Sequence, residues 1–420
     1  MTDITLPKLA ADPSCMDDYD PNAMSVDQAR NFIQQFLSPV TESETLPIRE
    51  SIGRILAEDI TSPCNVPNHN NSAMDGFAFK HAPGIKLIKI IGTAYAGKPF
   101  QGTVKASECV KIMTGAVIPD GVDTVVMKEK TVNKGEYISL LDQPERGSNI
   151  RLAGEDLQQG QAVLSKGHQI KAADIGLIAS LGIAEATVYR QLKVAFFSTG
   201  DELVSVGKPL QEGQIYDSNR YTIYGMLSRF KLIKTDLGAI PDQPELLENT
   251  LLKAAKEYDV IITSGGVSVG DADYMKMLLQ RHGQILFWKI NMKPGRPLAY
   301  GKVQNAHFFG LPGNPVSTMV TFYQFVQQAL LRLMGGIPKP TPTFQVECTE
   351  RIKKAKGRVE FQRGILFEEN GKWKVKPLLH QGSGILSSMS NANCFIVLSE
   401  ELSHCDIGTL VGVQPFEGII

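Results

Sequence analysis

The sequence has few cysteines, no paired cysteine motif and no long apolar run. Its six cysteines show no C-x-x-C spacing, so neither a zinc knuckle nor a disulfide framework is indicated. No apolar run reaches the roughly 18 residues that a membrane helix needs. The polar, acidic first residues resemble neither a signal peptide nor a transit peptide. These absences favour a cytoplasmic protein with reduced thiols and predict no membrane partner.

A large excess of charge of either sign is also missing. The 43 basic and 44 acidic side chains nearly cancel. This balance argues against a broad electrostatic grip on nucleic acid or on an anionic membrane. Any anionic ligand must therefore meet a local cluster of donors.

The length of 420 residues is too great for one ordinary hydrophobic core. Ser25 to Gln28 has the capping-box form, which predicts an amphipathic helix, and a second helical stretch is expected around Ile52–Ile60. Short β-type runs follow at 86–91, 109–113, 124–132 and 137–141, and later strands alternate with helices, the first of which is expected at 221–230. We expect a multidomain α/β protein with these parts: a flexible tail (1–21), a discontinuous, elongated helical linker domain (22–60 and 149–190), an inserted small β-domain (61–148), a parallel-sheet α/β domain (191–338) and a C-terminal β-barrel-like domain (339–420).

Three strand exits in the 191–338 domain carry polar, glycine-containing turns, at 198–202, 263–273 and 311–317. Parallel strands would bring all three to the edge of the sheet where ligands bind. Glycines there let backbone N–H groups approach an anion, although ordinary βα turns and helix initiation are alternative explanations. The candidate cofactor-binding residues in these turns are Ser264, Gly265, Gly266, Ser268, Gly270, Pro312, Gly313, Asn314 and Pro315.

Carboxylates follow two of these strands and suggest a cation site. Mg²⁺ prefers oxygen ligands and usually shares its shell with substrate phosphates. The candidate metal ligands are Asp201, Glu202, Asp271 and Asp273, each of which could instead be a solvated helix cap.

Positive charge is concentrated in two places. If the segment that begins at Phe287 is a strand, Lys289, Asn291 and Lys293 share one of its faces, and Pro294 stops it. A second basic cluster opens the C-terminal domain, where Arg363 is the preferred anion ligand. Most of these lysines could equally belong to a solvated edge strand.

Two polar turns stand out in the β-domain, at 71–78 and 111–116. Asp75 lies in the first. A structural turn acceptor and a site carboxylate are equally acceptable roles for it.

Together these motifs resemble the molybdenum-cofactor biosynthesis family that includes bacterial MoeA and the E domain of gephyrin. The resemblance covers nearly all of 22–420. It rests on seven short segments that match in order: 72–78, 113–116, 154–156, 199–203, 263–270, 293–297 and 311–317.

The resemblance implies an elongated homodimer with four domains per chain and a cleft between the sheet domain of one subunit and the β-domain of the other. It also implies transfer of molybdenum from molybdate into adenylylated molybdopterin, with Mg²⁺ and release of AMP. A serine within 383–388 is implied to contact molybdate, with Ser383 as the candidate. The residues that stand where the family's functional residues stand are Asp75, Thr114, Asp156, Glu202, Asp242, Asp273, Lys289, Lys293, Pro312, Pro315 and Arg363.

We therefore expect a molybdopterin molybdenumtransferase. The expected partners are a second copy of the chain, molybdopterin adenylyltransferase and molybdoenzyme-maturation proteins. Two rival hypotheses are a gephyrin-like scaffold and a nucleotide pyrophosphatase on a related sheet domain. The combined set of acids and bases disfavours both.

Overall fold

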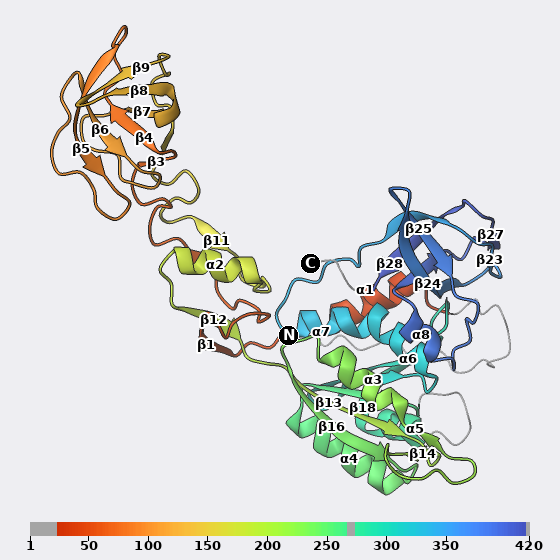
Figure 1. Cartoon of the computed structure of the whole chain (residues 1–420). Coiled ribbons are helices and arrows are strands. Elements are labelled where there is room, and N and C mark those ends of the chain that lie inside the picture. The colour runs from red at the N-terminus through yellow and green to blue at the C-terminus, as the bar shows by residue number, and fades with distance from the viewer. Residues whose placement is uncertain (1–22, 267–273, 417–420) are drawn as a thin grey trace. The chain divides into compact units, whose positions relative to one another are not determined.

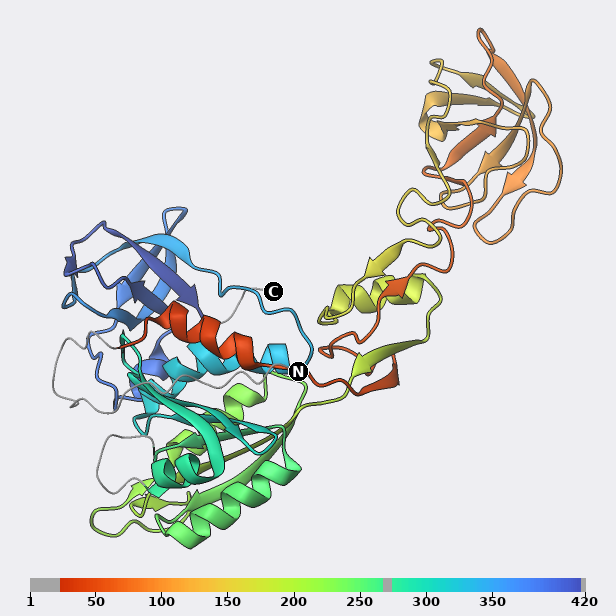
Figure 2. The ribbon, with the colours of Figure 1, turned by 180° about the vertical axis from the view of Figure 1, so that it is seen from behind.

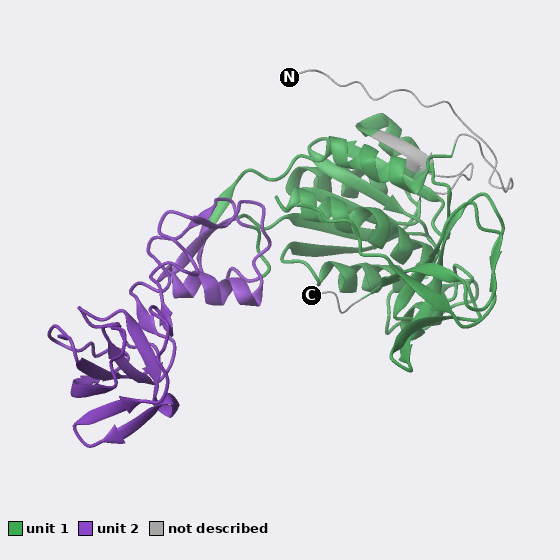
Figure 3. Ribbon diagram, turned by 90° about the horizontal axis from the view of Figure 1, so that it is seen from above, with its two compact units in different colours: residues 1–44, 53–55, 189–420 green, residues 45–52, 56–188 purple. Residues whose placement is uncertain are grey.

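The computed structural model describes residues 23–266 and 274–416. The chain divides into two compact units (Figure 3). Unit 1 contains the described residues up to 44, residues 53–55 and those from 189 onward, and unit 2 contains residues 45–52 and 56–188. Within the described ranges, no helix is long and apolar enough to cross a membrane.

Unit 1 is built on a six-stranded sheet with the strand order β16-β13-β17-β21-β20-β18. The strands are β13 (Lys193–Thr199), β16 (Ile233–Ile240), β17 (Val260–Ser264), β18 (Gly283–Lys289), β20 (Pro297–Val303) and β21 (Ala306–Leu311). The first four in spatial order are parallel, as predicted, whereas β20 and β18 are antiparallel to their neighbours. The sheet is therefore mixed. The sequence analysis missed β20, whose Pro297 and Gly301 are unfavourable in a strand interior.

Helices cover both faces of this sheet (Figures 1 and 2). Side chains alternate along β13, so Val194 and Phe196 join one core cluster and Ala195 and Phe197 the other. The first cluster includes residues of α1 (Val26–Phe36), α3 (Ser218–Leu227), α6 (Pro315–Thr321), the π-helical turn Phe322–Val326 and α7 (Gln327–Leu333). The second includes residues of α4 (Pro244–Glu257) and α5 (Tyr274–His282).

The first predicted helix is confirmed, and the second prediction is wrong. In α1 the Ser25 hydroxyl accepts from the backbone N–H of Gln28 at 3.1 Å, and the Gln28 side chain accepts from the N–H of Ser25 at 2.9 Å. Residues 52–60 form turns and bridges instead of a helix. Gly53 adopts a φ of +77°, which a right-handed helix cannot contain, and Leu56 pairs with Val188 in an antiparallel bridge.

The C-terminal part of unit 1 is a closed five-stranded barrel, which confirms the barrel-like prediction. Its strands follow the order β24-β25-β22-β28-β26, and β26 pairs back onto β24. The elements of this part are β19 (Met292–Lys293), β22 (Phe344–Cys348), β23 (Ile352–Lys353), β24 (Val359–Glu369), β25 (Lys372–Pro377), α8 (Ser387–Asn391), β26 (Cys394–Leu398), β27 (His404–Cys405) and β28 (Leu410–Pro415). The short strand β19 pairs in parallel with β24 and so connects the barrel to the sheet part of unit 1.

Unit 2 contains a second six-stranded sheet with the order β7-β4-β6-β5-β9-β8. Its strands are β4 (Gly76–Phe79), β5 (Leu87–Ala94), β6 (Glu108–Ile112), β7 (Thr124–Met127), β8 (Thr131–Lys134) and β9 (Tyr137–Leu140). The four predicted β-type runs all fall on these strands. The other elements are β2 (Ile60–Thr61), β3 (Asn71–Ser72), the 3₁₀ turn Lys128–Lys130, β10 (Ile150–Arg151), β11 (Ala162–Leu164) and α2 (Ala172–Ser180).

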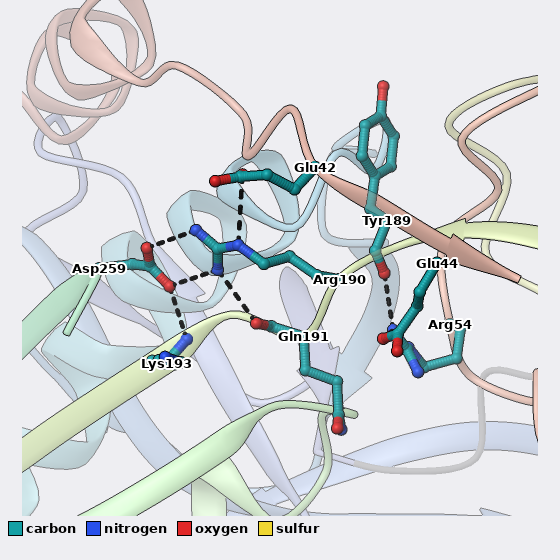
Figure 4. A network of polar contacts seen from close by, with 8 residues as sticks. All are labelled: Glu42, Glu44, Arg54, Tyr189, Arg190, Gln191, Lys193 and Asp259. Carbon is teal, nitrogen blue, oxygen red and sulfur yellow. Dashed lines mark hydrogen bonds and ion pairs between the residues drawn. The ribbon is translucent and has the colours of Figure 1, made fainter. Parts of the chain in front are cut away.

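The chain changes units within β1 (Ser43–Pro47) and at the end of β12 (Glu185–Tyr189). On the unit 1 side, the Arg190 guanidinium donates two hydrogen bonds of 2.8 Å to Asp259 and one of 3.2 Å to Glu42 (Figure 4). Asp259 also accepts from the backbone N–H of Lys193 at 2.7 Å. These bonds raise the pKa of Arg190, chiefly through Asp259. They fix the start of β13, the first strand that leads to the site.

Candidate functional site

A cavity of about 490 Å³ opens at the carboxyl end of the unit 1 sheet. β13 leads through α3 to β16 on one side, and α4 then leads to β17 on the other side of β13. The strand order therefore reverses between β13 and β17, and crevices of this kind bind ligands in open α/β sheets. All three predicted turns reach this cavity.

Eight of the predicted site residues line the cavity. Glu202 follows β13, and Ser264, Gly265 and Gly266 follow β17. The turn after β21 contributes four further residues, Pro312, Gly313, Asn314 and Pro315. The structure thus brings together residues that lie more than 100 positions apart in the sequence.

The glycines of the second turn are required by geometry. Gly265 and Gly266 have φ values of +91° and +67°. A Cβ at Gly265 would lie 2.6 Å from the carbonyl oxygen of Thr199, and one at Gly266 would lie 3.0 Å from the Thr199 hydroxyl. Only glycine lets the two strand ends approach so closely while the backbone stays exposed to a ligand.

Asn219, which the sequence analysis did not single out, connects the second and third turns. Its side-chain amino group donates to the Ser264 hydroxyl at 2.7 Å and to the carbonyl of Gly313 at 2.6 Å. Asp217 caps α3 and holds Asn219 in the first turn of that helix. The predicted helix began at Tyr221, two positions too late to reveal Asn219. The Asp-Ser-Asn segment at 217–219 is typical of a helix start and could have indicated that the helix begins earlier.

Two buried polar atoms of cavity-lining residues lack hydrogen-bond partners among the described residues. They are the Thr199 hydroxyl and the carbonyl oxygen of the Asn219 side chain. The two residues are only 5% and 9% exposed. An unsatisfied buried polar atom is costly, so its retention favours a binding role over a purely structural one.

Acidic residues gather at the exit of β13. Glu202 lines the cavity, and the backbone N–H of Asp242 donates to the Asp201 carboxylate at 3.0 Å. Partial burial, followed by the charges of Asp201 and Glu202, raises the pKa of Asp242. No group of three or more possible ligands among the described residues has the arrangement of a metal site. Ser268, Gly270, Asp271 and Asp273 lie outside the described residues.

The helix start in the third turn is confirmed. Asn314 occupies the N-cap position and Pro315 the first helical position, although the Asn314 side chain makes no capping bond. The backbone N–H of Val316 donates to the carbonyl of Ser383 at 3.0 Å. This bond brings the predicted molybdate-contacting segment of the barrel against the start of α6.

Arg363 is 1% exposed and holds the same segment from the barrel side. Its guanidinium donates to the Ser388 hydroxyl at 3.1 Å and to the carbonyls of His380 and Gly382 at 3.3 and 3.1 Å. Burial lowers the pKa of Arg363 to about 10. In the described contacts Arg363 holds this loop, and its predicted role as an anion ligand stays a prediction.

The two predicted lysines are in different environments. The Lys289 ammonium is buried without a hydrogen-bond partner in the described part of the chain. Lys293 is 56% exposed and lies 3.6 Å from the buried carboxylate of Glu360. The predicted continuous strand is interrupted, because β18 ends at Lys289 and β19 begins at Met292.

In unit 2 the structure pairs Asp75 with Thr114. One Asp75 oxygen accepts from the backbone N–H and from the hydroxyl of Thr114, both at 2.7 Å. These bonds, the backbone one first, lower the pKa of Asp75. Asp156 is exposed, and its backbone N–H donates to the carbonyl of Val66 at 3.0 Å.

Three family models match the chain in order. They are the MoeA N-terminal region (domain I and II) over 24–182, the probable molybdopterin binding domain over 195–332, and the MoeA C-terminal region (domain IV) over 345–416. The matched ranges cover most of the described residues.

Individual relatives agree with these models. A protein of Haemophilus influenzae named molybdopterin molybdenumtransferase is 45% identical over 402 residues, covering 94% of this chain and all of that protein. Gephyrin of Dictyostelium discoideum is 36% identical over 93% of this chain and 62% of its own length. The crystal structure of the molybdopterin biosynthesis MoeA protein of Pyrococcus horikoshii superposes with a TM-score of 0.82 at 28% identity, covering 94% of this chain and 100% of that chain. The chain therefore belongs to the MoeA family of molybdenum-cofactor biosynthesis proteins.

Proposed function

We propose that this protein is a molybdopterin molybdenumtransferase, which inserts molybdenum from molybdate into adenylylated molybdopterin and releases AMP. The cavity between β13 and β17 is the observation that carries this proposal. Its glycine turn, its unpaired polar atoms and its position at the strand-order reversal suit a nucleotide-linked ligand. The Haemophilus influenzae relative, which is named molybdopterin molybdenumtransferase, supports the same activity.

The reaction has two steps, cleavage of the phosphoanhydride bond and insertion of molybdenum, and different groups of the protein would serve each step. Water adds across the phosphoanhydride bond, which leaves AMP and the pterin monophosphate. The dithiolene sulfurs replace molybdate oxygens, which leave as water. The backbone N–H of Gly266 would hold a phosphate oxygen, because glycine leaves that backbone uncovered, whereas the Gly265 N–H donates to the carbonyl of Leu311 at 3.1 Å. Lys293, with its accessible ammonium, would offset negative charge on the pterin phosphate or on molybdate.

Magnesium is part of the proposal. The oxygen donors near the β13 exit are of the type that a hard cation prefers. Burial, followed by the charges of Asp201 and Glu202, raises the pKa of Asp242, and a bound cation would relieve the repulsion among these carboxylates. Asp201 and Glu202 would hold Mg²⁺ together with Asp271 and Asp273. The cation would neutralise phosphate charge during cleavage.

We further propose that the protein works in the cytoplasm as a homodimer. The Asp75–Thr114 pair is accessible to solvent, and the charges of Lys128 and Lys111 act on the Asp75 carboxylate. A second copy could supply the three turns of the unit 1 cavity. Molybdopterin adenylyltransferase would deliver the substrate, and molybdoenzyme-maturation proteins would accept the product.

The test is to incubate the purified protein with adenylylated molybdopterin and Mg²⁺, with and without molybdate. We expect AMP release that depends on molybdate, and a product that contains molybdenum and activates a cofactor-free molybdoenzyme. AMP release that proceeds equally well without molybdate, with no metallated product, would indicate a pyrophosphatase instead. The absence of both AMP and product would favour a scaffold.

A further inference from the structure

The two turns that form the phosphate-facing wall of the cavity are joined at their strand ends, where the Gly265 N–H donates to the Leu311 carbonyl and the Ser264 hydroxyl donates to the Pro312 carbonyl, and farther out by one side chain. Asn219 donates to Ser264 in the second turn and to the carbonyl of Gly313 in the third. The turns are neighbours, because a Cβ on Gly313 would lie 4.0 Å from the Cα of Gly265. No backbone hydrogen bond is found between the Gly313 carbonyl and the second turn among the described residues. Among the described residues, it is therefore Asn219 that ties the outer part of the third turn, at Gly313, to the second turn.

The orientation of the Asn219 amide follows from its partners. The Gly313 carbonyl can only accept a hydrogen bond. The Ser264 hydroxyl donates its own hydrogen to the carbonyl of Pro312 at 3.3 Å, so it too acts as an acceptor toward Asn219. The amino group must therefore face both turns, and the oxygen must face away from them.

Fold stability alone does not explain an asparagine at this position. Its two hydrogen bonds are favourable, but its carbonyl oxygen is buried and has no partner among the described residues. The gain from two bonds and the penalty of one unsatisfied acceptor are of similar size. The side chain should therefore contribute little to the net stability of unit 1.

We propose that Asn219 is a positioning residue, which fixes the glycine turn and the 312–314 turn at the separation that the nucleotide phosphate needs. This inference rests on the proposed function, since it assumes that the cavity binds the adenylyl group. Asn219 acts through Ser264 and Gly313, and the phosphate itself is bound by the turns. Loss of the amide would free the Gly313 part of the third turn from the second turn and would weaken nucleotide binding while the strand ends stay joined and the fold persists.

The experiment measures AMP binding by calorimetry, together with the melting temperature, for the full-length wild type and the Asn219→Ala variant. We expect about tenfold weaker AMP binding in the variant, equivalent to about 1.4 kcal/mol, with a melting temperature close to that of the wild type. A matched control is Thr222→Ala, which removes a 3.0 Å hydrogen bond to the Ser218 carbonyl on the same helix and should change neither quantity.

A second variant, Ser264→Ala, removes one end of the same connection and keeps the test decisive if Asn219→Ala fails to fold. It should weaken AMP binding by about threefold, and the double variant should lose less affinity than the product of the two single effects, because both changes remove the Asn219–Ser264 bond. Unchanged AMP binding in both single variants would overturn the positioning role and leave the proposed function intact. A wild type that does not bind AMP would overturn both.

Discussion

The cavity of unit 1 and the Asp75 turn of unit 2 hold their polar groups in opposite ways. In unit 1, Asn219 and Arg363 are buried and bonded to several neighbours, so each connects two or more segments. In unit 2, the Asp75 carboxylate is bonded to Thr114 and stays accessible. The difference indicates that changes at the Asp75 turn should affect the reaction with little effect on folding, whereas a change at Arg363 should affect folding as well.

The largest effect on stability is expected for Arg363→Lys. Lysine keeps the charge but lacks the planar fork that serves Ser388 and the two loop carbonyls. Buried acceptors left without a partner should lower the free energy of unfolding by about 3 kcal/mol. Denaturant unfolding measures this change. The control is Arg351→Lys, an exposed barrel arginine that lies 3.4 Å from Asp406 and should lose less than about 0.5 kcal/mol. Equal losses of unfolding free energy in the two variants would contradict the expectation that the buried Arg363 holds the loop.

Acid should destabilise unit 1 through His307. Burial lowers the pKa of His307 to about 4, so the folded state keeps this side chain neutral at pH values where the unfolded chain binds a proton. The neutral His307 therefore contributes about 3 kcal/mol to the free energy of unfolding. This contribution is complete above pH ~6.5 and is lost as the pH falls toward 4.

The variant His307→Asn should flatten this pH dependence of the free energy of unfolding. His404→Asn, which changes an accessible barrel histidine, should preserve it. An unchanged slope in His307→Asn would show that other groups cause the acid sensitivity.

A smaller effect on stability, with a large effect on binding, is expected for Gly265→Ala. The positive φ and the 2.6 Å approach to the Thr199 carbonyl should cost about 2 kcal/mol. AMP binding should weaken at the same time, because the turn must move. Gly313→Ala is the matched control for stability, since its Cβ would meet nothing closer than 4.0 Å. A fully stable Gly265→Ala protein would argue against the required close approach.

The smallest effect on stability is expected for Asp75→Asn. The amide oxygen can still accept both hydrogen bonds from Thr114, so the melting temperature should hardly change, while molybdenum insertion should fall at least tenfold. Asp123→Asn is the comparison within the same unit. Asp123 accepts from the N–H of His81 at 2.7 Å and from Arg146 at 2.8 Å, so that variant should lose stability. Full activity in the Asp75→Asn variant would contradict a role of unit 2 in the reaction.

The sequence predicted features that depend on local chemistry or on strand order. The capping box at Ser25 and the glycine turn at Gly265 are local patterns with one favourable geometry. The prediction that the three turns meet at one edge of the sheet followed from the expectation that their strands are parallel. Asn219 was missed because its partners, Ser264 and Gly313, are 45 and 94 positions away. The loop contacts of Arg363 were also missed, since no sequence pattern shows which distant carbonyls a buried guanidinium will bind.

The central claim is that the two regions serve one reaction in a dimer with shared sites. The direct measurement mixes an Asp75→Ala subunit with a Glu202→Gln subunit and assays molybdenum insertion. In a mixed dimer with shared sites, one site contains both substitutions and the other contains neither. With random pairing, we predict recovery of about a quarter of the wild-type activity from two inactive parents. No recovery in a verified mixed dimer would contradict the claim.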